Sequence, residues 1–228
     1  MPQRIRPLAV AFDLDGLMFD TEALFFRVAG AMLAARGKAL TQAIMNAMIG
    51  RGAADAGESF KRMAGLDEPV EDLMSEARSR FMAEIDTAVH PTPGLFALLG
   101  HLQQLGIPRV VTTSSCRVYA EGLLRKHGVF DHFAGVLTGD DVTNGKPDPE
   151  IYLKAAESLG VEPGRMPVLE DSAPGLASAK AAGAFAVGVP HGHSPAEGLS
   201  QADLIIPRLD APVLLELLER KDRDDEPS

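Results

Sequence analysis

The sequence predicts an α/β protein whose core is a doubly wound parallel sheet of the Rossmann-like type, interrupted after its first strand by an α-helical insertion. Short apolar runs alternate with helical patterns over residues 90–220, which is typical of parallel strands joined by helices. Residues 21–89 show helical periodicity without a strand pattern. We therefore expect a core of residues 1–20 and 90–220, a helical cap of residues 21–89, and a disordered tail of residues 221–228.

The strands are expected where apolar runs stop at polar residues or glycines. The first run, Leu8–Phe12, stops at two acids, Asp13 and Asp15. The later runs are Ile107–Thr112, Gly135–Thr138, Pro167–Leu169, Ala184–Val189 and Leu204–Ile206. Ligands of such sheets bind beyond the carboxyl ends of the strands, so the polar residues that follow these runs are expected to meet in one crevice.

The helices are expected between residues that start and stop helices. In the insertion, the helical patterns Ala23–Ala35 and Thr41–Ile49 each end near a glycine. In the core, Thr92 is expected to be an N-cap, with Pro93 at the first helical position. The other core helices are expected over Arg117–His127, Pro149–Leu159, Ala173–Ala182 and Pro212–Arg220.

The composition restricts the possible partners. The 22 basic and 32 acidic residues give a net charge of −10, which provides no basic surface for nucleic acid or an anionic membrane. With Cys116 as its single cysteine the chain cannot form an internal disulfide, and we expect a cytoplasmic protein. No apolar run approaches the length of a membrane span. A small-molecule partner is expected, and the chain is expected to be a monomer or a small homo-oligomer.

Four segments that follow strands carry side chains suited to phosphate chemistry. They are Asp13 with Asp15, Thr113–Ser115, Lys146, and Glu170 with Asp171. Carboxylates gathered at one sheet edge repel one another by about 4 kcal/mol per close pair at an effective dielectric of about 20, so a cation is expected. Oxygen ligands without histidine favour Mg²⁺. A carboxylate nucleophile, a lysine and a hydroxyl around a phosphoryl group then indicate phosphoryl transfer.

Taken singly, these residues also have ordinary structural explanations. Thr113–Ser115 could cap the helix that begins near Arg117, and Asp171 could cap the helix that follows it. Lys146 alone could be a solvated surface charge. The combination of four such segments at one edge is what favours a catalytic site.

Four motifs resemble those of the haloacid dehalogenase superfamily in order and spacing, over nearly the whole chain. They are Asp13–Glu22, Val111–Ser115, Gly145–Pro149 and Leu169–Gly175. The helical insertion resembles the small cap of the branch that contains beta-phosphoglucomutase and many sugar-phosphate and nucleotide phosphatases. The resemblance implies a Mg²⁺-dependent phosphatase that hydrolyses a small phosphorylated metabolite through an aspartyl-phosphate intermediate.

The resemblance also implies a role for each motif residue. Asp13 would be the nucleophile and a Mg²⁺ ligand, and Asp15 would be the general acid and base that also binds the metal through its backbone carbonyl. The remaining implied roles are phosphate binding by Thr113, Ser114 and Lys146, and metal binding by Glu170 and Asp171.

Two alternatives stay open from the sequence. A mutase resembling beta-phosphoglucomutase is disfavoured by Phe25 and Ala53, which stand where that enzyme carries a histidine and a cap arginine. A non-enzymatic, receiver-like phospho-acceptor module is disfavoured by Asp15 and by the insertion, since such a module has neither. The candidate substrate contacts are Phe25, Arg51, Ser115 and Arg117.

Overall fold

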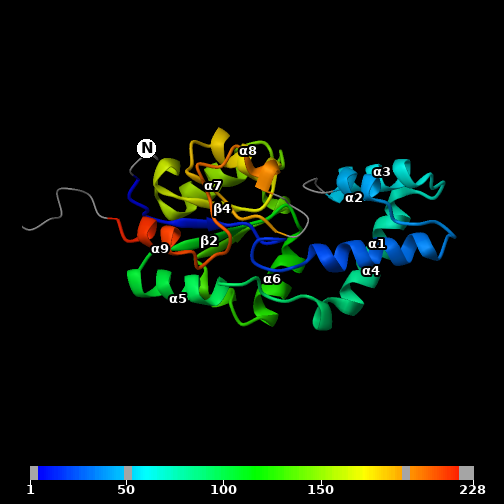
Figure 1. Ribbon diagram of the computed structural model, residues 1–228, viewed down its shortest axis with the longest axis horizontal. Helices are drawn as coiled ribbons and strands as arrows, with labels where there is room; N and C mark the ends of the chain where they lie inside the picture. Colours follow the sequence, from blue (N-terminus) through cyan, green and yellow to red (C-terminus); the bar gives the residue numbers. More distant parts are fainter. Residues whose placement is uncertain (1–4, 49–52, 192–195, 221–228) are drawn as a thin grey trace, which may run out of the picture. The chain divides into compact units, whose positions relative to one another are not determined.

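The computed structural model describes residues 5–48, 53–191 and 196–220, which divide into two compact units (Figure 1). One unit comprises Met1–Met18 and Pro91–Ser228, and the other comprises Phe19–His90. The tail expected to be disordered, 221–228, lies outside the described residues. Within the described ranges, no helix is both long enough and apolar enough to cross a membrane.

The first unit is built on a parallel sheet whose six described strands lie in the order β3-β2-β1-β4-β5-β6. The strands are β1 (Val10–Phe12), β2 (Arg109–Thr112), β3 (Gly135–Leu137), β4 (Val168–Glu170), β5 (Ala186–Gly188) and β6 (Leu204–Ile205). The chain winds outward from β1 to β3 and then resumes at β4 on the other side of β1. This is the predicted doubly wound sheet, and ligands of such sheets bind where the winding reverses. The prediction of the fold class is confirmed.

Strand β1 lies at the centre of the sheet. Its Ala11 pairs with Val110 of β2 on one side and with Val168 of β4 on the other. All three residues of β1 are fully buried. A strand covered on both faces has no polar face, which explains why the first apolar run shows no alternation of polar and apolar residues.

Helices cover both faces of the sheet. Helices α7 (Glu150–Leu159) and α8 (Ala173–Ala181) lie on one face, and α5 (Leu95–Leu105) and α9 (Pro212–Leu218) lie on the other (Figure 1). Helix α6 (Arg117–Lys126) packs against β3. The core between these layers supports the loops at the carboxyl ends of the strands.

The start of α5 differs from the prediction. The helix begins at Leu95, and its N-cap is Gly94 in the left-handed conformation. The hydroxyl of Thr92 instead donates to the carbonyl of Leu17 at 2.5 Å, and the N–H of Thr92 donates to the carbonyl of Met18 at 2.9 Å. The prediction that Thr92 caps the helix is wrong, because this residue ties together the two segments by which the chain leaves and re-enters the first unit. Pro93 also precedes the helix.

The second unit is helical. Its described helices are α1 (Glu22–Ala34), α2 (Gln42–Met48), α3 (Ala53–Ala64) and α4 (Val70–Ala88). Helix α1 packs against α4, and α2 packs against α3. Just beyond α1, the guanidinium of Arg36 binds the carboxylates of Glu68 and Glu76 at 2.7 Å each. The hydrogen bond from Arg36 lowers the pKa of Glu76 below its usual value, so this contact is an ion pair at neutral pH.

A pair of substitutions in α5 tests the packing of the first unit. Leu98 is fully buried, and Phe96 on the same helix is 58% exposed. We predict that Leu98→Ala lowers the free energy of unfolding by about 2–5 kcal/mol through lost burial and a residual cavity. The matched control Phe96→Ala should change it by less than about 0.5 kcal/mol. Urea denaturation followed by far-ultraviolet circular dichroism measures both, and equal effects would contradict the described packing.

Candidate active site

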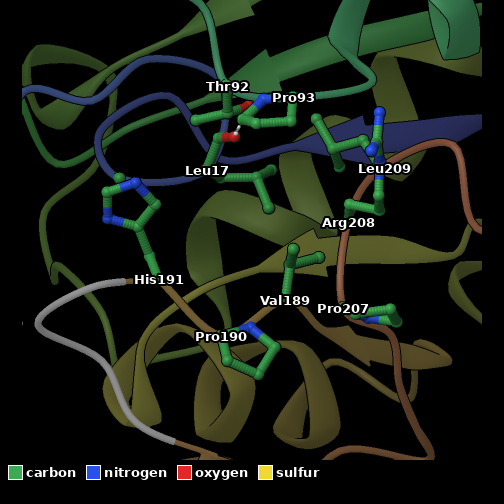
Figure 2. Close-up of a pocket in the computed structure, with 10 residues that line it drawn as sticks. Leu17, Thr92, Pro93, Val189, Pro190, His191, Pro207, Arg208 and Leu209 are labelled. Carbon is green, nitrogen blue, oxygen red and sulfur yellow. Dashed lines mark hydrogen bonds between the residues drawn. The ribbon is translucent and has the colours of Figure 1, made fainter.

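A cavity of about 220 Å³ opens among the loops that follow β1, β5 and β6 (Figure 2). Gly16 and Leu17 line it from the loop after β1, His191 from the loop after β5, and Arg208 from the loop after β6. These loops all lie at the carboxyl ends of their strands. The cavity therefore adjoins, through Gly16, the edge at which the sequence predicts the site.

Three buried carboxylates gather where the winding of the sheet reverses. Asp13 directly follows β1, Glu170 is the last residue of β4, and Asp171 comes next. Oxygen atoms of these three residues lie within 4.8 Å of one another. The N–H of Asp13 donates to the carbonyl of Leu169 at 3.0 Å, so the pairing of the two central strands continues to the acid itself. The register of the sheet thus brings the first and fourth motifs together.

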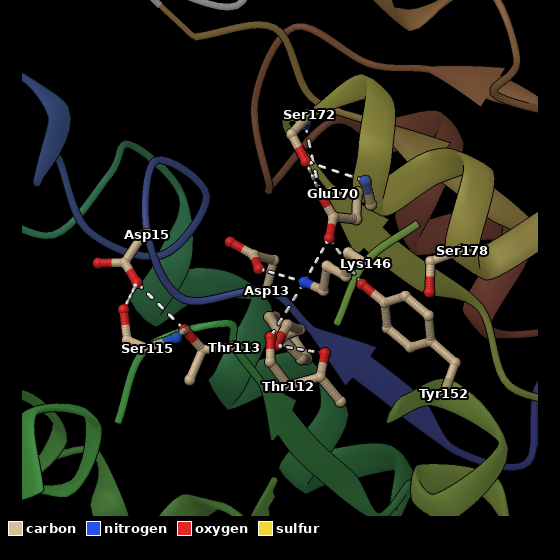
Figure 3. Close-up of polar contacts among 12 residues, drawn as sticks. Asp13, Asp15, Thr112, Thr113, Ser115, Lys146, Tyr152, Glu170, Ser172 and Ser178 are labelled. Carbon is tan, nitrogen blue, oxygen red and sulfur yellow. Dashed lines mark hydrogen bonds and ion pairs between the residues drawn. The ribbon is translucent and has the colours of Figure 1, made fainter. Parts of the chain in front are cut away.

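Lys146 binds two of these carboxylates (Figure 3). Its ammonium donates to Asp13 at 2.5 Å and to Glu170 at 2.6 Å, and it also reaches the carbonyl of Thr112 at 3.4 Å. The side chain of Lys146 is 5% exposed. Lys146 is therefore a buried part of the carboxylate cluster, and the alternative of a solvated surface charge is excluded.

Glu170 is fully buried and accepts several hydrogen bonds (Figure 3). Its Oε1 atom accepts from the hydroxyl of Tyr152 at 2.6 Å as well as from Lys146. Its Oε2 atom accepts from the N–H and the hydroxyl of Ser172 at 3.2 and 2.8 Å. Burial raises the pKa of Tyr152 well above its usual value, so its hydroxyl keeps the proton that it donates. These donors stabilise the carboxylate form of Glu170 without water.

Two glycines leave room for the carboxylates. A Cβ atom on Gly16, whose φ is +84°, would lie 2.1 Å from Oδ2 of Asp171. A Cβ atom on Gly175 in α8 would lie 1.9 Å from the carboxyl carbon of Glu170. Both side chains therefore lie directly against backbone. A larger residue at either glycine would displace the carboxylate next to it.

The cluster carries an excess of negative charge. The three carboxylates and the ammonium group of Lys146 together carry a formal charge of −2 when all are ionised. Burial raises the pKa of Asp13 well above its usual value, although Lys146 opposes this shift. Burial lowers the pKa of Lys146, but the charges of Asp13 and Glu170 outweigh burial and raise it well above its usual value. Lys146 is therefore charged, and a further cation would stabilise the Asp13 carboxylate.

Asp15 lies beside the second motif in different surroundings (Figure 3). It is half-buried, and its Oδ2 atom accepts hydrogen bonds from the hydroxyls of Thr113 at 3.1 Å and Ser115 at 2.8 Å. Its Oδ1 atom accepts from the hydroxyl of Tyr119 on α6 at 2.7 Å. Thr113 and Ser115 therefore contact the site, and they do not cap α6, whose first N–H is bound by the carboxylate of Asp140. Ser114 is exposed.

The remaining candidate substrate contacts, Arg117, Phe25 and Arg51, are not members of the carboxylate cluster. The guanidinium of Arg117 binds the carboxylate of Asp141 at 2.6 Å and that of Glu121 at 3.1 Å. In the second unit, Phe25 is 37% exposed, and its ring meets the rings of Phe26 and Phe81 edge-on. Arg51 lies outside the described residues.

Sequence reasoning overlooked two tyrosines of the site. Tyr152 lies six residues after Lys146, and Tyr119 lies four residues after Ser115. Tyr119 lies in the first turn of the helix that follows the second motif, and this place is the signal that could have drawn attention to it. For Tyr152, the signal is its place in the first turn of the helix that follows the lysine motif.

Comparison with known proteins identifies the family. The family model for haloacid dehalogenase-like hydrolases matches residues 7–183. The chain belongs to this family. Validoxylamine A 7'-phosphate phosphatase of Streptomyces hygroscopicus subsp. limoneus is 34% identical over 196 residues, which cover 86% of this chain and 91% of that protein. Phosphoglycolate phosphatase of Neisseria gonorrhoeae is 33% identical over 230 residues, which cover 96% of each.

A solved structure of the same architecture is CbbY from Rhodobacter sphaeroides in complex with phosphate. It superposes with a TM-score of 0.77 at 27% identity, covering 90% of this chain and 96% of that one. The predicted membership of the haloacid dehalogenase superfamily is therefore confirmed. So is the predicted enzyme class, a hydrolase of phosphoric monoesters.

A glycine substitution tests the geometry of the carboxylate cluster. In Gly175→Ala the new Cβ would force the carboxylate of Glu170 away from Lys146 and Tyr152. We predict a loss of about 3–5 kcal/mol in the free energy of unfolding, the usual effect of breaking a buried ion pair. Gly100→Ala on α5 is the matched control, since its Cβ would meet nothing within 4 Å. It should raise stability by up to about 1 kcal/mol. Thermal unfolding checks both variants, and an unchanged Gly175→Ala protein would contradict the close approach.

Proposed function

We propose that the protein is a Mg²⁺-dependent phosphatase that hydrolyses small phosphorylated metabolites through a phosphorylated Asp13. The observation that carries this proposal is the buried cluster of Asp13, Glu170 and Asp171 around Lys146 at the reversal point of the sheet. The cluster combines a nucleophile, a cation for phosphate oxygens and a set of metal ligands within a few ångströms.

The residues present fit a magnesium ion. The clustered donors are carboxylate oxygens, which Mg²⁺ prefers, and the negative charge of the cluster exceeds what Lys146 offsets. Asp13, Glu170 and Asp171 would hold the ion, with Gly16 leaving the space for Asp171. When bound, the ion supplies positive charge that neutralises phosphate oxygens. The backbone carbonyl of Asp15 is proposed as a further ligand, as the family resemblance implies.

The protein's own residues would divide the reaction into two steps. A carboxylate oxygen of Asp13 attacks phosphorus, the bond to the leaving oxygen breaks, and Asp15 gives its proton to that oxygen. Asp15 then takes a proton from a water molecule that attacks phosphorus, which releases inorganic phosphate and restores the Asp13 carboxylate. Thr113, Ser114 and Lys146 would hold the phosphoryl oxygens, and Lys146 is already beside Asp13.

The substrate class rests on the relatives. The names of two similar proteins specify validoxylamine A 7'-phosphate and phosphoglycolate as their substrates, and a third, from Thermotoga maritima, is called a phosphorylated carbohydrates phosphatase. We place this chain among phosphatases of sugar phosphates or nucleotides, with the helical unit as the cap that selects the leaving group. A cytoplasmic location, expected from the single cysteine, is part of the proposal.

The mutase alternative is not favoured. The curated relatives named above are phosphatases. A mutase must also hold a second phosphate, and Arg117, one candidate for that task, is engaged by Asp141 and Glu121. A second phosphate would have to displace these carboxylates from the guanidinium.

The nucleophile is tested by an isosteric substitution. We predict that Asp13→Asn abolishes turnover, because an amide is too weak a nucleophile to form the phosphorylated intermediate. Asp131→Asn, at an exposed position, is the matched control and should keep wild-type activity. Phosphate release from a panel of phosphorylated metabolites measures both, and mass spectrometry after rapid quenching should find phosphate on Asp13 of the wild type. Metal-dependent turnover by Asp13→Asn would exclude Asp13 as nucleophile.

The metal is tested by removing it. We predict that chelation of divalent ions abolishes turnover and that added Mg²⁺ restores it. Asp171→Asn should raise the Mg²⁺ concentration needed for half-maximal activity by about 10-fold or more, since one anionic ligand is lost. Mg²⁺ should also raise the melting temperature of the wild type, because the ion binds the folded state. Full activity of chelator-treated protein in excess chelator would rule out the metal.

A further inference from the structure

We infer that Tyr119 is a positioning residue that holds Asp15 for its proton transfers, an inference that rests on the proposed function. Tyr119 lies outside the four motifs, in the first turn of α6, and its hydroxyl donates to Oδ1 of Asp15 at 2.7 Å. Its role would be to fix the direction in which the Asp15 carboxyl group delivers and accepts a proton.

The two oxygens of Asp15 are held from different elements. Oδ2 accepts from Thr113 and Ser115 in the loop after β2, and Oδ1 accepts from Tyr119 on α6. A carboxyl group bound through one oxygen can still rotate about its Cβ–Cγ bond. Bonds to both oxygens set the plane of the group, so Tyr119 supplies the orientation that the motif hydroxyls alone do not.

Substrate binding would increase the dependence on Tyr119. The hydroxyl of Thr113 has one hydrogen, which it gives to Asp15 here, while its oxygen accepts the N–H of Ser115 at 3.0 Å. If Thr113 donates to a phosphate oxygen, as proposed, that hydrogen leaves Asp15. Ser115 and Tyr119 then hold one oxygen of Asp15 each during the reaction.

Hydroxyl groups suit a residue that alternates between acid and base. A hydroxyl donates to a carboxylate and, after rotation of its hydrogen, accepts from a carboxylic acid. A lysine or arginine in the place of Tyr119 could donate but could not accept. Tyr119 can therefore hold Asp15 before and after it gives its proton to the leaving oxygen.

The helix that carries Tyr119 is itself anchored. The N–H of Arg117 donates to Asp140 at 2.8 Å, and the guanidinium of Arg117 binds Asp141 and Glu121. The bonds to Asp140 and Asp141 tie the first turn of α6 to the loop after β3, whereas Glu121 lies on α6 itself. Arg117 therefore helps to hold the helical turn that carries Tyr119. It is also a candidate substrate contact.

The test compares kcat/KM for two substrates that differ in their leaving group. Tyr119→Phe removes the hydroxyl and keeps the ring. The two probes are the sugar phosphate that the wild-type protein hydrolyses best, whose alkoxide needs a proton to depart, and 2,4-dinitrophenyl phosphate, whose phenolate departs without one. The ratio kcat/KM reports the steps up to transfer of the phosphoryl group to Asp13. We expect Tyr119→Phe to lower kcat/KM by about 10-fold for the sugar phosphate, the effect of one lost hydrogen bond, and by less than about 2-fold for the aryl ester.

Two further variants separate the possible failures. Asp15→Asn should show the same selectivity on a larger scale, about 10²–10⁴-fold for the sugar phosphate. Tyr152→Phe, which removes the hydroxyl bound to Glu170, is the matched control and should lower both rates equally. If Asp15→Asn is selective and Tyr119→Phe affects both probes equally or neither, the inference about Tyr119 is wrong and the proposed function stands. If Asp15→Asn itself lacks selectivity, the proposed acid role of Asp15 fails, and this inference with it.

Discussion

The concentration of negative charge at the reversal point of the sheet is the constraint on which the rest of the site depends. Asp13, Glu170 and Asp171 lie within 4.8 Å of one another with almost no exposure to water, and Lys146 offsets part of their charge. Such a cluster is stable only if donors replace water, which is why Glu170 has hydrogen bonds on both oxygens. It also leaves an excess of negative charge that a divalent cation would offset, so that an anionic phosphate could approach.

Two acids separated by one residue have opposite surroundings, and this difference matches their proposed roles. Asp13 is buried beside a charged lysine that binds its carboxyl group, which suits the proposed nucleophile. Asp15 is half-buried among hydroxyl groups that tolerate both of its protonation states. The leucine between them is fully buried. A single turn after β1 can thus present a nucleophile and a proton donor with different environments.

The sequence was sufficient for the fold and for the members of the carboxylate cluster, because both depend on local patterns. Each central strand is an apolar run that stops at the functional residue, and the order of runs and helices limits the topology. Contacts made across the fold were not predictable. Thr92 resembles a helix cap locally but donates to Leu17, 75 residues away. Tyr119 contacts Asp15, 104 residues away, and Gly175 matters because of where Glu170 lies.

The partners of the described cations bear on where the proposed substrate would be recognised. Lys146 binds two of the carboxylates, which suits its proposed contact with the transferred phosphoryl group, whereas Arg117 binds Asp141 and Glu121. In the proposed mechanism, the described core residues around Asp13 and Asp15 would serve the chemistry common to all phosphate monoesters. Discrimination between leaving groups needs contacts that this chemistry does not use. We therefore propose the helical unit as the determinant of specificity, which would let relatives named for compounds as different as phosphoglycolate and validoxylamine A 7'-phosphate share one core chemistry.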